Sequence, residues 1–94
     1  MTSSRGRRYR VEIKPSAVRA LQRLHASVRA KLTAIIDALA DDPRPAGCKK
    51  LAGSAKLFRV RAAGVYRIVY EVRDDVLTVV VIRIGHRRDV YRGL

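Results

Sequence analysis

The stretch Val79-Val80-Val81-Ile82-Arg83-Ile84-Gly85-His86-Arg87-Arg88-Asp89-Val90-Tyr91 decides how this chain folds. Its first half is a β-branched run, which is typical of a buried strand. Gly85 follows that run and is expected to let the backbone turn sharply. A histidine, two arginines and a tyrosine lie within the next six residues. The stretch therefore predicts a rigid strand that carries chemically reactive side chains at its end.

Length and composition predict one folded domain. The chain has 94 residues, and 48% of them are hydrophobic, which suits a single modest core rather than a disordered chain. Residues 1–8 are basic and no apolar signal region follows them, so we expect a flexible basic arm before a domain at 9–94. No stretch approaches the roughly 20 apolar residues that span a bilayer, and a cytoplasmic location is the default expectation.

Positive charge is the strongest compositional signal. There are 21 Lys and Arg against 8 Asp and Glu, which gives a formal net charge of +13. A small domain this basic favours a polyanionic partner, and nucleic acid is expected before a membrane surface. Arginine suits bidentate phosphate contacts. With only four Tyr and one Phe, contacts to the nucleic-acid backbone should dominate over base stacking.

Residues 16–39 predict a helical hairpin. One helix is expected from Ser16 to about His25 and a second from Ser27 to Leu39, each with its serine as N-cap. Apolar residues recur at helical spacing in both segments, so each helix has one apolar stripe that can pack on a sheet.

Short alternating runs predict the strands. The run at 9–13 is expected to end at Pro15. The runs at 57–61, 65–72 and 76–84 are joined by tight connections, which predicts an antiparallel meander. We expect the first strand to join this sheet through a right-handed crossover beside a parallel neighbour. The predicted fold class is α+β with the order β-α-α-β-β-β, a helical hairpin packed on one face of a small, mainly antiparallel four-stranded sheet.

Alternation also divides the side chains of the meander between two faces. Tyr66 and Ile68 share the face that suits the helices. The opposite face is expected to collect Arg59, Arg61, Arg67 and Arg83. Like charges this close repel one another unless an anion bridges them. With His86 and Arg87 expected at its rim, this face predicts an anion-binding surface.

Three motifs follow one another in the chain: Leu57-Phe58-Arg59-Val60-Arg61, Tyr66-Arg67-Ile68-Val69-Tyr70 and the segment from Gly85 to Tyr91. Together with the element order, they resemble the RelE/ParE superfamily of bacterial toxin–antitoxin modules, and the RelE branch most. The resemblance covers nearly all of 9–92. It implies a toxin that enters the ribosomal A site and cuts mRNA there, inhibiting translation. It also implies a cognate antitoxin that neutralises the toxin in a hetero-oligomer.

The implied reaction is attack of a ribose 2′-OH on the adjacent phosphate, with no metal or other cofactor. It leaves a 2′,3′-cyclic phosphate and a 5′-OH, and it needs a base, an acid and positive charge around the phosphorane. By resemblance, Arg67 and Arg87 stabilise the phosphate, and Arg59 occupies a basic position near it. Tyr91 matches the tyrosine that orients the substrate or assists proton transfer. Other basic residues expected to bind RNA are Lys49, Lys50, Lys56, Arg61, Arg83 and Arg88.

The general base stays open at this point. Some family members carry a lysine two residues before the Arg59 position, where this chain has Leu57, although Lys56 is adjacent. His86 is the first candidate because imidazole suits acid–base work near neutral pH. Tyr91 is the second candidate.

Two other functions compete with the nuclease. A ParE-like toxin would bind and inhibit DNA gyrase without cutting RNA, although the combination of Arg67, Arg87 and Tyr91 favours the nuclease. A plain nucleic-acid-binding module would show steep salt dependence and no product. The single cysteine, Cys48, rules out an internal disulfide, and no His, Cys, Asp and Glu residues have metal-ligand spacing.

Overall fold

The computed structural model describes residues 8–94, so the expected basic arm at 1–8 lies outside the described residues except for its last position. The elements are β1 (Arg10–Ile13), α1 (Pro15–Gln22), α2 (Ala26–Ala38), β2 (Lys49–Lys50), β3 (Leu57–Ala62), β4 (Tyr66–Arg73), the 3₁₀ turn η1 (Asp74–Val76) and β5 (Thr78–His86). The sheet order is β1-β5-β4-β3-β2. β1 runs parallel to β5 and the other pairs are antiparallel.

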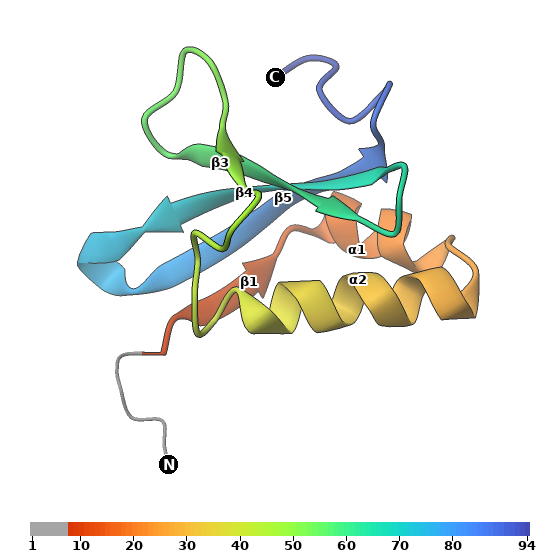
Figure 1. Cartoon of the computed structure of the whole chain (residues 1–94), viewed down its shortest axis with the longest axis horizontal. Helices are drawn as coiled ribbons and strands as arrows, with labels where there is room; N and C mark the ends of the chain where they lie inside the picture. Colours follow the sequence, from red (N-terminus) through yellow and green to blue (C-terminus); the bar gives the residue numbers. More distant parts are fainter. Residues whose placement is uncertain (1–7) are drawn as a thin grey trace.

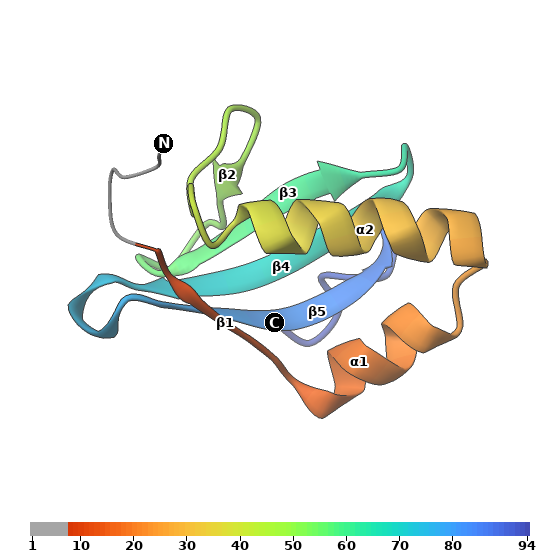
Figure 2. The same cartoon turned by 90° about the horizontal axis from the view of Figure 1, so that it is seen from below.

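The predicted α+β architecture is confirmed. Both helices lie on one face of the sheet, with α1 beside β5 and α2 across β3 and β4 (Figures 1 and 2). The other face carries no helix. The short strand β2, which pairs with β3 at the edge of the sheet, adds a fifth strand to the four predicted. Within residues 8–94, neither helix has the length and apolar character needed to cross a membrane.

The helices begin at positions that differ from the predicted ones. Pro15 starts α1 instead of ending β1, and the cap is Lys14 rather than Ser16. Proline suits the first helical position because its fixed φ is helical and the missing N–H needs no partner there. His25 caps α2: its Nδ1 accepts a hydrogen bond of 3.2 Å from the backbone amide of Ser27. The backbone amide of Ser27 is therefore capped by His25, and Ser27 is not the N-cap residue of α2.

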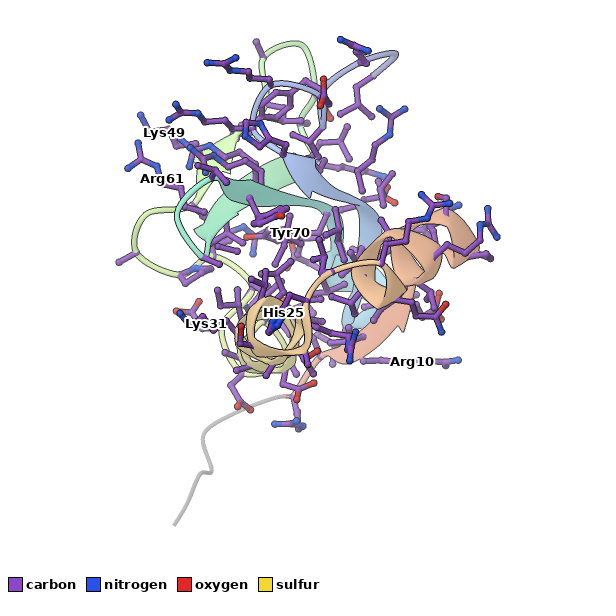
Figure 3. The ribbon with its side chains drawn as sticks, turned by 90° about the vertical axis from the view of Figure 1, so that its right-hand side faces the viewer. Arg10, His25, Lys31, Lys49, Arg61 and Tyr70 are labelled. Carbon is purple, nitrogen blue, oxygen red and sulfur yellow. The ribbon has the colours of Figure 1, made fainter. Side chains whose placement is uncertain are left out.

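The core lies between the helices and the sheet. Its largest fully buried side chains are Leu32, Leu39, Ile68, Tyr70, Val79 and Val81. Tyr70 sits beneath the sheet on the side of the helices (Figure 3), and its hydroxyl donates a 2.8 Å hydrogen bond to the carbonyl of Pro43. This bond fixes the loop that follows α2. Burial raises the pKa of Tyr70 above its usual range.

Replacing Tyr70 with phenylalanine is expected to lower the free energy of unfolding by about 1–2 kcal/mol, because it leaves the buried Pro43 carbonyl without a donor. The raised pKa adds a pH signature. An unfolded tyrosine ionises near pH 10 whereas the native Tyr70 stays protonated, so the wild type should lose stability faster than the variant as pH rises above about 10. Urea unfolding at pH 7 and at pH 10.5 measures both effects, and equal stability at pH 7 would contradict the expectation.

A β-bulge controls the direction of Arg83. In the pairing of β4 with β5, Val69 lies opposite Arg83 and Tyr70 lies opposite Val81, so Ile82 is an extra residue. Without it, strict alternation from the buried Val81 would turn Arg83 toward the core. The extra residue reverses the alternation, so Ile84 is buried and Arg83 faces the open side. Bulges commonly redirect a side chain near functional sites.

Candidate active site

The face of the sheet without helices carries the predicted arginines. Arg61 pairs with Arg67 across β3 and β4, and Arg59 pairs with Lys49 across β3 and β2. Figure 3 shows Lys49 and Arg61 projecting outward from the sheet. With Arg83, these residues form what we call the arginine face: Lys49, Arg59, Arg61, Arg67 and Arg83. None of its members forms an ion pair with a carboxylate of residues 8–94, so its positive charge is not neutralised within this part of the chain.

Arg59 is the member with an unsatisfied donor. Its Nη1 is buried and has no hydrogen-bond partner among the residues that the structure describes. A buried donor without an acceptor costs free energy, and such atoms are rare in native proteins. An anionic oxygen bound at the arginine face would satisfy it. This unsatisfied donor is therefore a candidate contact for an anion, which would reach Nη1 when the atoms that cover it move aside.

Arg67 and Arg87 both donate hydrogen bonds to the turn between β3 and β4. The Nη1 of Arg67 donates to the carbonyls of Gly64 at 3.1 Å and Tyr66 at 2.9 Å. The backbone amide of Arg87 donates to the carbonyl of Val65 at 2.7 Å. The side chain of Arg87 remains exposed. Two arginines distant in sequence are thus held at one corner of the arginine face.

A groove of about 400 Å³ completes the site. Its lining residues are Leu51, Ala52, Gly53, Ser54, Leu57, Tyr91 and Leu94. In Figure 1 the loop before β3 and the C-terminal segment both rise on the side away from the helices, and these two segments supply the groove. Tyr91 is 37% exposed, so its ring forms part of the groove wall and remains accessible.

The sequence did not point to this groove. Its apolar wall comes from Leu51, Leu57 and Leu94, none of which was predicted as a site residue. Ser54 holds the loop in place, because its Oγ accepts hydrogen bonds of 3.2 Å from the amides of Lys56 and Leu57. The serine after Gly53 was the one local signal of an ordered turn.

Gly85 has a different role from the predicted one. β5 continues through it to His86, and its φ is not positive. A Cβ at Gly85 would lie 3.7 Å from the side chain of Val90, which is 3% exposed. Gly85 therefore provides the surface on which Val90 packs, rather than a sharp turn.

His86 lies on the other face of the sheet. It pairs with Tyr66, whose ring packs against the core, and the two rings meet edge to face with centroids 6.4 Å apart. Its Nδ1 accepts a 3.2 Å hydrogen bond from the amide of Arg88. The expectation that His86 borders the arginine face is thus wrong, because the alternation that buries Ile84 turns His86 toward the helices.

The remaining predicted RNA-binding residues are scattered. Lys50 pairs with Phe58, a core residue, so it faces away from Lys49. Lys56 is exposed in the loop before β3, and Arg88 is exposed after β5. Within residues 8–94, no three His, Cys, Asp or Glu side chains are grouped as a metal site would need.

Comparison with known proteins identifies the class. A family model described as the ParE toxin of type II toxin–antitoxin system, parDE, matches residues 11–91. Toxin RelG of Mycobacterium tuberculosis is 41% identical over 44 residues, which are 47% of this chain and 46% of that protein. This second match thus spans about half the length of the curated relative. The chain belongs to the RelE/ParE family of toxins from type II toxin–antitoxin systems.

Solved structures of RelE toxins are similar in fold to this chain. A chain of the archaeal RelE–RelB complex from Pyrococcus horikoshii has a TM-score of 0.76 and 29% identity, covering 87% of this chain and 98% of that one. A chain of the toxin–antitoxin complex RelBE2 from Mycobacterium tuberculosis has a TM-score of 0.73 and 30% identity, covering 85% and 99%. The resemblance inferred from the sequence is confirmed, and the fold is RelE-like.

Proposed function

We propose that this chain is a ribosome-dependent mRNA interferase that cleaves mRNA in the ribosomal A site. The observation that carries the proposal is the buried, unpartnered Nη1 of Arg59 on the arginine face. It lies on β3 together with Leu57, which lines the groove. RNA offers the matching chemistry, with anionic phosphate oxygens for the arginines and a sugar or base for the groove.

The geometry supports division of the reaction among a few side chains. Arg59 would hold a non-bridging oxygen of the scissile phosphate once RNA binding uncovers its Nη1, which has no hydrogen bond to break among residues 8–94. Arg67 and Arg87 would add charge as the phosphorane forms. The carbonyl contacts of Arg67 orient its guanidinium, so little reorganisation accompanies the reaction. The proposed cleavage reaction uses no metal ion.

Tyr91 is the better candidate for proton transfer or for orientation of the 2′-OH. It lines the groove that lies on the open side of the sheet, whereas His86 contacts Tyr66 on the side of the helices. A phenol is a poor base near neutral pH, so much of the rate would come from orientation of the RNA by the ribosome. The enzyme is thus expected to be slow on free RNA.

We also propose that a cognate antitoxin neutralises this toxin. The RelE proteins of Pyrococcus horikoshii and of E. coli have been crystallised in complexes with RelB. A net charge of +13 and the unpaired arginine face suit an acidic segment that folds upon binding. Co-expression with the acidic protein encoded beside this toxin should restore growth.

Replacing Arg87 with alanine is expected to abolish growth arrest in a bacterial host. Induction of the wild type should produce new 5′ ends within translated reading frames, detected by primer extension, and Arg87→Ala should remove them. Arg19→Ala on α1 is the matched control, because it deletes the same charge from an exposed position on the helix side. Arrest without new 5′ ends would contradict the nuclease.

Inhibition of DNA gyrase is the second candidate function, because the matching family model describes ParE toxins. A gyrase poison would arrest growth without cutting mRNA, and it would slow supercoiling by purified gyrase. In that case Arg59→Met and Tyr91→Ala would leave toxicity intact. A supercoiling assay beside the primer extension separates the two functions.

A further inference from the structure

Arg83 was predicted as an RNA-binding residue, but its guanidinium is used within the protein. Its Nη1 donates to the carbonyl of Val90 at 3.3 Å and also to the carbonyl of Arg92. Neither carbonyl accepts a backbone hydrogen bond from residues 8–94. Nη1 carries two N–H groups, so this one nitrogen can donate to both carbonyls at once.

The two carbonyls bound by Arg83 flank Tyr91. One belongs to the residue before it and one to the residue after it. Residues 87–94 contain only turns, so no helix or strand ladder holds this segment. Its other anchors are Val90, which packs on Gly85, and the amide of Arg87, which donates to the carbonyl of Val65. Arg83 and Gly85 together therefore fix the backbone that presents the Tyr91 ring to the groove.

The bulge at Ile82 is what makes this contact possible. It turns Arg83 to the open side, directly below the returning segment. Gly93 lies beside this contact: its φ of +74° favours glycine, and an added Cβ would lie 3.6 Å from Arg83 Nη2, an ordinary van der Waals distance. The bulge at Ile82, the side chain of Arg83 and the positive φ of Gly93 thus occur together at this contact.

The geometry points to Arg83 as a positioning residue for Tyr91 that does not itself bind RNA. This inference rests on the proposed function, because Tyr91 is assigned there to the reacting sugar. The charge of Arg83 still contributes to the arginine face. Its specific role, however, is to place Nη1 within reach of the carbonyls of Val90 and Arg92, and the lysine side chain is one bond too short to bring its Nζ to that position.

The test compares Arg83→Lys with Arg83→Gln in single-turnover cleavage on programmed ribosomes. Both variants should lower kcat by about 10-fold to 100-fold, the scale expected for a small misplacement, with KM within about twofold of the wild type. Retained cleavage by Arg83→Lys beside loss in Arg83→Gln would overturn the inference, because charge alone would then be sufficient. The double variant Arg83→Lys/Tyr91→Ala should be no slower than Tyr91→Ala, and additive losses would also overturn it.

A readout independent of cleavage separates this inference from the proposed function. With ¹³C-labelled tyrosine rings, the Tyr91 signal, assigned through Tyr91→Phe, should shift in Arg83→Lys while those of Tyr9 and Tyr70 stay in place. Gly93→Val should shift the same signal without altering any charge. An unmoved Tyr91 signal in Arg83→Lys would overturn the inference. If the wild type cuts no mRNA, the proposed function fails, and the ring signals alone decide whether Arg83 positions Tyr91.

Discussion

Replacing Arg59 with methionine is expected to lower the rate of mRNA cleavage on the ribosome by about 100-fold or more, the usual loss when one preorganised donor to a developing anion is removed. Arg59 Nη1 is buried and has no acceptor in residues 8–94, so it meets the phosphate without first breaking a hydrogen bond. Methionine keeps the apolar stem and deletes the guanidinium. Single-turnover cleavage of a ribosome-bound message measures the loss.

The same substitution should leave the folded protein as stable as the wild type or more stable. It removes a buried donor without a partner and one of several clustered like charges, and relief of such a group is worth about 1 kcal/mol. Thermal unfolding of the free protein measures this change as an unchanged or higher Tm. A gain in stability with a loss of activity is typical of a residue held in place for function.

Arg19→Met on α1 is the control for net charge. It should alter neither cleavage nor Tm appreciably, because Arg19 is exposed on the side of the helices. The assignment of Arg59 to the phosphate would be wrong if Arg59→Met cleaved mRNA as fast as Arg19→Met. It would also be weakened if Arg59→Met lowered the Tm strongly, since the guanidinium would then stabilise the fold.

Strict alternation explains which site residues could be predicted. In β3 and β4 apolar and basic residues alternate, so the shared face of Arg59, Arg61 and Arg67 followed from the sequence. β5 offers no such signal from Val79 to Ile82, because four consecutive β-branched residues suit either face. The bulge there could not be predicted, and the bulge decides that Arg83 faces the open side and His86 the side of the helices rather than the reverse.

The groove could not be predicted because it depends on contacts between distant parts of the chain. Leu51 lies in the loop before β3, Leu57 begins β3, and Leu94 returns from beyond β5. Residues 87–94 have no apolar period that would indicate a helix or strand. Contacts to β5 place the segment, namely the two hydrogen bonds from Arg83 Nη1 and the packing of Val90 on Gly85. Such contacts emerge only once the sheet has formed.

Replacing Gly85 with a larger residue is therefore expected to lower the rate of mRNA cleavage, and the loss should grow with the size of the new side chain. A Cβ at this position would meet Val90 at 3.7–3.8 Å, which is ordinary van der Waals contact, so Gly85→Ala should cleave mRNA nearly as fast as the wild type. The longer side chain in Gly85→Leu would occupy the place of Val90 and lift residues 87–94 from the sheet. Because Arg87 and Tyr91 both move with that segment, cleavage should fall by about 100-fold or more.

A compensating substitution distinguishes displacement of the segment from general damage to the fold. Gly85→Val/Val90→Ala exchanges volume between the two positions and should recover much of the activity that Gly85→Val loses. Backbone strain does not complicate the series, because the φ of Gly85 is not positive. Circular dichroism should show the same fold in every variant. Full activity of Gly85→Leu would mean that the seat of Val90 on Gly85 does not position Arg87 and Tyr91, and that these residues reach the RNA from another arrangement.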